Sequence, residues 1–531
     1  IFSNYNIDFS KNVSSTTGIN KFGHQINIFG NTKNNIGALT GNDAKYTLGA
    51  GSINLSGKKS IDNIGILVGG DEITHATDGT VIGDVVTIKG NASAASDTDK
   101  SDRGNRAITA VGYKTVNGTD VPNSVTVNAV ESTDAINSIT LVANNKAKIT
   151  VNDTASTPTI IGTSGVSTTA GVSITNSIFK YDDTRVKSAT DKTSSDNVGA
   201  AYANKDAEIT INRISRPSPA NITIKGAKDD FTDKYVGFGL FANNRGTINA
   251  QYNSIKVDDA STAVASLNKG NIDLTGAKVE FNGEGYALYT GIDKDSADFT
   301  PGVSDTGKIN LTTGELALGG KAIGYINDQA LTGSNRAITF NNTDISVTSD
   351  DVIIADLKNT GPGGQVVVNV GPGSNVLKDE LLGTGIGSIS SSTGINRYKY
   401  AVVDNAKINI RKDIDKANVA ATPTLPIPDD DIFTRRFLYQ NSIINVDKGV
   451  TVKAELDTAR LNEIDPDLKT PIGLAVTASA NSKDTSTTGI NNKGTISADR
   501  TDGTDKGGIG LYVDYGFINN KNTGIVNKIG R

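Results

Sequence analysis

The sequence predicts an all-β protein folded as a right-handed parallel β-helix, a solenoid interrupted by loops. Only 36% of the residues are hydrophobic, and 57 Gly stand against 12 Pro, as is typical of many short strands joined by turns. Ile and Val nevertheless recur at regular places, which disordered chains do not show. A short strand–corner–strand segment also recurs along the chain, and this repetition points to a solenoid.

The clearest copy of this segment is GFGLFANNRGTINA at 237–250, where apolar residues alternate on both sides of a polar corner at 243–246. Alternation with period two predicts strands and excludes a helix. Further copies lie at 141–151, 201–211, 265–274, 401–410 and 511–519. Stacked coils of roughly 20–25 residues would let each strand bond to the coils above and below it.

Small and medium residues occupy the positions expected to face the interior, which predicts a narrow core between facing strands. These positions are Leu240, Ala242, Ala265, Leu267, Ala201, Ala203, Ala401 and Val403. Phe241, Tyr202 and Tyr512 share one outward position between two inward residues. Such rings could stack on sugars, but we favour a packing ladder that stiffens the solenoid.

Asn at each corner has a physical role, because it tolerates left-handed backbone angles and its amide can bond to the Asn of the next coil. The Gly that follows one to three positions later is expected to supply a positive φ. Tandem immunoglobulin-like domains would repeat near every 90–100 residues with aromatic landmarks, and a propeller would show a blade signature. The repeat here is shorter, and the chain has no Trp.

We expect residues 1–531 to form a single continuous β-helix that is a fragment of a longer chain. Five stretches break the alternation and predict loop excursions, the last with a possible short helix. They lie near 91–104, 181–197, 291–307, 411–438 and 456–471.

Composition and motifs argue against several function classes. The net charge of −5 without a basic stripe disfavours nucleic acid as a partner. Cys is absent, so no disulfide forms, and no apolar run approaches the length of a membrane-spanning helix. The Gly-rich segments at 361–364 and 371–374 lack the Lys of a phosphate-binding loop. His24 and His75 have no partner at a metal-ligand or triad spacing.

Carboxylate clusters keep an enzyme as the alternative, because β-helical polysaccharide lyases and hydrolases use acidic groups on one face. The candidates are Asp229-Asp230, Asp258-Asp259, Asp350-Asp351 and Asp429-Asp430-Asp431. Two sets of aspartates have spacings that weakly resemble those of calcium-binding loops. They are Asp293, Asp295 and Asp298, and Asp499, Asp502 and Asp505. Nothing selects one constellation, and we predict no catalytic residue, no metal site and no cofactor.

Several short motifs of the chain resemble those of a known protein family. STTGIN occurs at 15–20 and 486–491, SSTGIN at 391–396, and GIGLYVDYGFINNKNTGI at 508–525. With the absence of Cys, they resemble the passenger regions of large autotransporter adhesins (type V secretion), particularly the fusobacterial ones. The resemblance implies a passenger covalently continuous with an outer-membrane β-barrel and displayed at the bacterial cell surface. It further implies binding to host cells or other bacteria through protein receptors or glycans.

The sequence therefore predicts a non-enzymatic adhesin segment, with a polysaccharide lyase or hydrolase, or a structural spacer, as alternatives. The loop at 429–439 is the candidate binding loop, because acidic residues there adjoin aromatic and basic ones. Its candidate residues are Phe433, Arg435, Arg436, Phe437 and Tyr439.

Overall fold

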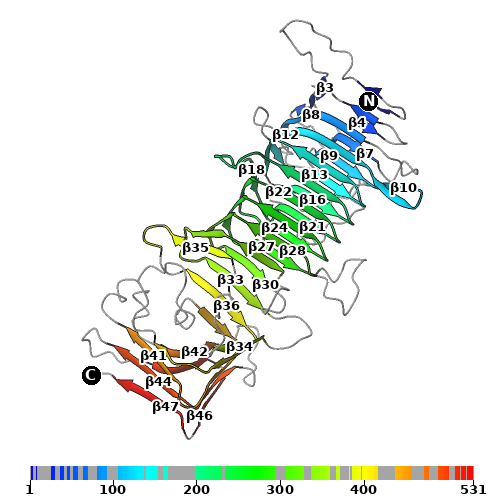
Figure 1. The fold of residues 1–531 in the computed structure, drawn as a ribbon. Helices are drawn as coiled ribbons and strands as arrows, with labels where there is room; N and C mark the ends of the chain where they lie inside the picture. Colours follow the sequence, from blue (N-terminus) through cyan, green and yellow to red (C-terminus); the bar gives the residue numbers. More distant parts are fainter. Residues whose placement is uncertain are drawn as a thin grey trace. The chain divides into compact units, whose positions relative to one another are not determined.

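Short β-strands make up most of the described chain in the computed structural model, which falls into two compact units, Ile1–Glu315 and Leu316–Arg531 (Figure 1). The described residues are 2–3, 7–8, 25–29, 36–40, 45–47, 52–57, 64–69, 80–91, 106–136, 139–153, 159–164, 198–229, 234–292, 306–327, 337–358, 366–370, 382, 385–395, 398–415, 437–456, 472–477, 488–500, 509–514, 516–521 and 523–529.

Parallel pairing sorts most strands of the first unit into three rows, while β19 (Ala227–Asp229) and β20 (Lys234–Val236) form one of two separate antiparallel pairs. The first row is β1 (Phe2–Ser3), β4 (Ile36–Thr40), β7 (Ile64–Val68), β9 (Arg106–Val111), β13 (Ile139–Asn144), β16 (Gly199–Asn204), β21 (Phe238–Asn243), β24 (Thr262–Leu267) and β27 (Tyr286–Gly291). The second includes β2 (Ile7–Asp8), β5 (Lys45–Thr47), β14 (Lys148–Asn152), β17 (Glu208–Asn212), β22 (Thr247–Gln251), β25 (Asn271–Thr275) and β28 (Lys308–Thr312). The third includes β3 (Gln25–Phe29), β6 (Ser52–Gly57), β15 (Ile160–Ser164), β18 (Ile222–Lys225), β23 (Ser254–Asp258) and β26 (Lys278–Gly283).

Two long strands, β8 (Thr80–Asn91) and β12 (Ser124–Ile136), belong to both the second and the third row. Ser124 of β12 pairs with Lys148 of β14, whereas Glu131 pairs with Ile160 of β15. Each long strand therefore passes through a corner without a break.

Strands of the second unit also pair in parallel rows. One row is β30 (Ile323–Asn327), β33 (Ile353–Lys358), β36 (Lys399–Asp404), β39 (Phe437–Gln440), β42 (Ile472–Thr477) and β45 (Ile509–Asp514). Another is β34 (Val366–Val370), β37 (Ala406–Ile410), β40 (Ile443–Val446), β43 (Gly489–Asn492) and β46 (Phe517–Asn520). A third is β38 (Ile414–Asp415), β41 (Thr451–Leu456), β44 (Thr495–Arg500) and β47 (Ile525–Ile529). The remaining strands are β29 (Glu315–Gly320), β31 (Ile338–Asn341), β32 (Thr343–Val347) and β35 (Ile386–Ser391).

Successive coils stack in register, which confirms the predicted right-handed parallel β-helix. Tyr202 of β16 pairs with Phe241 of β21, and Asn244 and Asn268 occupy successive corners 24 residues apart. The expected coil length is thus confirmed here. That the whole chain is one continuous β-helix stays a prediction.

The interior is lined as predicted in most coils. Leu240, Ala242, Ala201 and Ala203 are fully buried, and so are Ala401 and Val403 in the second unit. The prediction for β24 is wrong by one residue, because Val264 pairs with Leu240 while Ala265 pairs with outward-facing Phe241. The register places Leu267 at the position that Asn243 holds in the preceding coil, so alignment by the first Asn of the corner misplaces β24.

Each corner of the central coils contains two successive residues with positive φ. Asn244 and Arg245 have φ of 45° and 64°, and Asn268 and Lys269 have 48° and 63°. The Nδ2 of Asn268 donates to the Oδ1 of Asn244 at 3.2 Å, and the Nδ2 of Asn244 donates to the Oδ1 of Asn204 at 3.1 Å. This confirms the predicted left-handed corners and the bonding of Asn between coils.

The predicted positive φ is wrong for Gly246 and Gly270, because Arg245 and Lys269 carry the left-handed angles instead, whereas it holds for Gly449, with φ of 81°. A Cβ on Gly246 would lie 2.2 Å from the carbonyl oxygen of Ala203 on the preceding coil. The same atom on Gly270 would lie 2.6 Å from the carbonyl oxygen of Ala242. Glycine is therefore used here for close approach of two backbones.

The second unit has its own ladder of asparagines along the β34–β46 row. Each Nδ2 donates to the Oδ1 of the preceding coil at 2.7–3.0 Å. Its members are Asn369, Asn409, Asn445, Asn491 and Asn519. The ladder holds consecutive coils in one register, because a slip would break all of its bonds.

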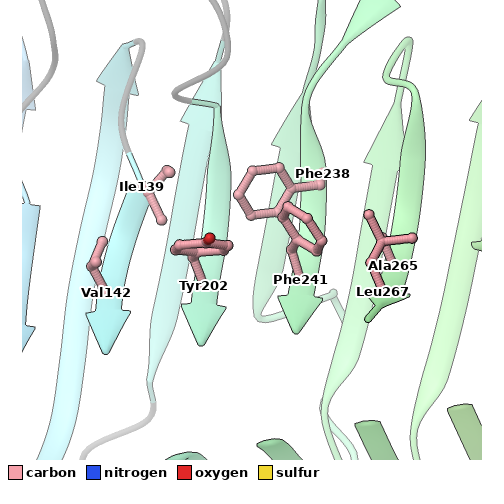
Figure 2. Close-up of a cluster of buried hydrophobic side chains, with 7 residues drawn as sticks. All are labelled: Ile139, Val142, Tyr202, Phe238, Phe241, Ala265 and Leu267. Carbon is pink, nitrogen blue, oxygen red and sulfur yellow. The ribbon is translucent and has the colours of Figure 1, made fainter. Parts of the chain in front are cut away.

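The outer side of the first row in the first unit carries a second apolar cluster (Figure 2). The rings of Tyr202 and Phe241 are 5.1 Å apart, and those of Phe238 and Phe241 are 5.5 Å apart. All three side chains are buried. The ring of Phe238 occupies the space that a Cβ on Gly199 would need. Tyr202 and Phe241 therefore pack as predicted and are not available to stack on a sugar, whereas Tyr512 is 42% exposed and lies outside this cluster.

Candidate functional site

A β-hairpin departs from the parallel coils between β9 and β12. Its strands β10 (Tyr113–Val116) and β11 (Thr119–Pro122) are antiparallel and appear beside the β10 label in Figure 1. Asn117 and Gly118 form the two-residue turn with φ of 50° and 79°. Positive φ at both positions is the requirement of a type I′ turn, which Asn-Gly meets best.

The base of the hairpin is fixed to the neighbouring corner by backbone bonds. The N–H of Gly112 donates to the carbonyl of Asn144 at 3.0 Å, and the N–H of Asn123 donates to the carbonyl of Gly112 at 3.0 Å. The buried Nδ2 of Asn123 also donates to the carbonyl of Val111 at 2.6 Å. The chain therefore leaves and re-enters the solenoid at one closed point.

Lys146, on the adjacent corner, holds one face of the hairpin. Its Nζ lies 2.5 Å from the Oδ2 of Asp120 and 4.2 Å from the centre of the Tyr113 ring. The Thr115 hydroxyl donates to the Oδ1 of Asp120 at 2.7 Å. The bond from Lys146, followed by the bond from Thr115, lowers the pKa of Asp120, and the bond to Asp120 raises the pKa of Lys146.

The opposite face of the hairpin is exposed near its tip. Val116 and Thr119 form a cross-strand pair, and Val116 is 39% exposed. Alternation places Lys114 and Val121 on the same face. Because Lys146 contacts the other face, the exposed β-branched pair faces away from the adjacent corner.

The loop between β17 and β18 is another described excursion. Ile214 is its most exposed large apolar side chain, at 69%. Arg213 forms a largely buried ion pair with Asp153, whose carboxylate also accepts from the N–H of Thr159 at 3.0 Å. Burial raises the pKa of Asp153 despite these partners. The Nη2 of Arg216 donates to the Oε1 of Glu315 at 2.7 Å. Two arginines therefore bond this loop to neighbouring parts of the first unit.

The binding residues predicted from the sequence do not form a described cluster. Phe433, Arg435 and Arg436 lie outside the described residues. Phe437 begins β39, and its backbone pairs with Ala401. Tyr439 is only 5% exposed, and burial raises the pKa of its hydroxyl. Its side chain belongs to the solenoid interior and has little surface to offer a ligand.

Within the described residues, no group of three or more His, Cys, Asp or Glu side chains is arranged to hold a metal ion. The Oδ2 of Asp258 lies 3.8 Å from the Nζ of Lys256 on the same strand. Asp350 and Asp351 lie in the turn before β33. The other carboxylate clusters, both histidines and the calcium-like spacings fall wholly or partly outside the described chain. Among the described residues there is also no helix of the length and apolar character that crossing a bilayer requires.

Sequence reasoning missed the hairpin, although its signal was present. Asn117-Gly118 stands between YKTV and TDVP, which both contain Thr and Val, and Asn-Gly is the dipeptide that best suits a two-residue hairpin turn. The loop excursions predicted near 91–104, 181–197, 291–307, 411–438 and 456–471 lie mainly outside the described residues.

Comparison of this chain with protein-family models, with curated proteins and with solved structures finds no match.

Proposed function

We propose that this chain is a segment of a secreted bacterial adhesin, displayed at the cell surface, that attaches to host cells or other bacteria. The observation that supports this proposal most is the β10–β11 hairpin. It is an excursion with a fixed base, one face held by Lys146, and an exposed tip at Val116 and Thr119.

A rigid scaffold that presents a local excursion is a common design for recognition. The hairpin is ordered before it meets a partner, so binding would not have to order it first. A β-branched tip bordered by polar groups suits a protein receptor or a glycan. The net charge of −5 gives no support for a nucleic acid partner.

The proposed location rests on the repeated STTGIN-type motifs and on the solenoid. In the proposed arrangement, the chain is covalently continuous with an outer-membrane barrel and is held outside the cell. The stacked coils would carry the hairpin away from the membrane surface.

Binding of the labelled chain to host cells and to partner bacteria tests the proposal. We expect saturable binding, and we expect the double variant Val116→Asp, Thr119→Asp to weaken it about tenfold or more by placing charge in the contact. The matched control is Ile160→Asp, Thr223→Asp, which alters exposed β-branched residues on the strands. Ile160 is 40% exposed, close to the 39% of Val116.

Two results would overturn parts of this proposal. Absence of saturable binding to any cell type would favour a structural spacer. Saturable binding that the hairpin variant and the control affect equally would remove the hairpin as the contact site. Circular dichroism of both variants should show the β-sheet signal of the parent chain.

A further inference from the structure

The turn of the β10–β11 hairpin contains a chemically labile pair, Asn117-Gly118. An asparagine followed by glycine can lose its side-chain amide without an enzyme, because glycine has no side chain to shield the backbone nitrogen that attacks the amide. Both residues are exposed, and the hairpin projects beyond the ends of the first-row strands in Figure 1. A Cβ built on Gly118 would have no atom within 4 Å. The turn therefore has space for the reaction.

No hydrogen bond within the described part of the chain holds the peptide group between Asn117 and Gly118. The carbonyl of Asn117 accepts no bond there, and the N–H of Gly118 donates none. The side-chain amide of Asn117 likewise has no partner among the described residues. Attack on the Cγ of Asn117 requires this peptide group to rotate. The turn leaves that rotation unhindered by bonds to the coils.

The second Asn-Gly pair of the sequence, Asn282-Gly283, offers a matched comparison. Asn282 is also exposed, but it lies in β26, where it pairs with Asp258 of the preceding coil. Its carbonyl accepts from the N–H of Asp259 at 2.9 Å, and a Cβ on Gly283 would lie 3.0 Å from that nitrogen. Rotation of this peptide group would first have to open a contact between coils.

We propose that Asn117-Gly118 is a site of spontaneous deamidation, whereas the stacked coils protect Asn282-Gly283. The backbone nitrogen of Gly118 attacks the Cγ of Asn117, and a C–N bond forms. The bond from Cγ to the side-chain nitrogen breaks, and that nitrogen leaves as ammonia with the proton of the attacking nitrogen. Water then opens the cyclic succinimide at either carbonyl, which yields aspartate or isoaspartate at position 117. The reaction consumes only water and needs no oxidant or reductant.

The two products differ in their effect on the hairpin. Aspartate keeps the backbone unchanged, and Asp-Gly also suits a type I′ turn. Isoaspartate routes the main chain through Cβ and so adds an atom to the turn that holds Val116 opposite Thr119. We expect isoaspartate to break this register and to separate the Tyr113 ring from Lys146. The face that the hairpin presents would then change with the age of the molecule.

Peptide mapping by mass spectrometry of the full chain, aged at mildly alkaline pH, tests the proposal. In the folded chain, conversion at Asn117 should be at least about tenfold faster than at Asn282, because Asn282 must first open a coil contact. In urea the two rates should become nearly equal, since neither pair is then held. Equal rates in the folded chain would overturn the proposal. So would a difference that persists in urea, because the flanking residues would then explain it.

Asn117→Asp is the matched control for the effect on the hairpin, because it carries the charge of the product without isoaspartate. When freshly prepared, it should keep the Tyr113 ring signals of the parent in NMR spectra. The aged parent should show a second set of Tyr113 signals that grows with its isoaspartate content, measured with an isoaspartate methyltransferase. A single, unchanged set in a chain rich in isoaspartate would disprove the effect on the hairpin. The reaction does not depend on whether the hairpin binds a partner, so binding to cells does not decide it.

Discussion

The first row of the first unit and the β34–β46 row of the second unit are held together by different interactions. In β13, β16, β21 and β24 all six residues are buried, because apolar side chains pack on both sides of the row. In β37 and β40, buried and less buried residues alternate, and the outer side carries the Asn ladder. Apolar burial contributes more per side chain than a partly exposed hydrogen bond. The two regions should therefore differ in their sensitivity to substitution.

Phe241→Ala should have the largest effect. It removes a fully buried ring that contacts Tyr202 and Phe238, which corresponds to about 3–5 kcal/mol. Hydrogen exchange of β16, β21 and β24 measures this loss locally, which suits a repetitive fold in which units open separately. The control, Tyr512→Ala, removes an outward ring that is 42% exposed and should change stability by at most about 0.5 kcal/mol. Equal losses of stability in Phe241→Ala and Tyr512→Ala would show that the outer cluster does not stabilise these coils.

Gly246→Ala tests the close approach of successive corners and should rank second. The Cβ of the new alanine would lie 2.2 Å from a backbone oxygen. The coils must therefore shift, which should lower the free energy of unfolding by about 1–3 kcal/mol. Gly270→Ala has a wider gap of 2.6 Å to its nearest backbone oxygen and should be milder. Urea unfolding, followed by tyrosine fluorescence, can compare the two variants. A reversed order would show that backbone contact does not explain these glycines.

Asn445→Ala probes the ladder of the second unit and should have a smaller effect. It leaves the Nδ2 of Asn491 and the Oδ1 of Asn409 without their ladder partner, which costs about 1 kcal/mol at a partly buried site. Asn519→Ala removes one ladder bond at an exposed position and should cost less. Exchange rates in β40 and β43 report the difference. If Asn519→Ala were as damaging as Asn445→Ala, the ladder would not act through paired amides.

More of this fold than of any functional site could be predicted from the sequence. Asn243-Asn244 was enough to predict a left-handed corner and a bond between coils, because few side chains suit both roles. Aligning 401–410 with 437–446 would have placed Tyr439 opposite the buried Val403 and shown it to be interior. The phase of β24 was predicted wrongly because Leu267 occupies the position of Asn243, so aligning the first Asn of each corner shifts the strand by one residue. The contact of Lys146 with Asp120 depends on where the hairpin leaves the coil, and local sequence does not encode that.

The smallest expected effect concerns the hairpin. We expect pH to change the docking of the hairpin onto the coils and to leave the global stability unchanged. The pKa of Asp120 is lowered from 3.8 by its bonds to Lys146 and Thr115, so docking is fully present above 3.8 and is lost as the pH falls through the lowered value. The pKa of Lys146 is raised from 10.5 by its bond to Asp120, so docking persists through 10.5 and is lost only as the pH rises through the raised value. The NMR shifts of the Tyr113 ring, which lies 4.2 Å from Lys146, follow both transitions. Asp120→Asn should remove the acid transition while leaving the coils intact, and a parent transition centred above 3.8 would contradict the carboxylate's role in holding the hairpin.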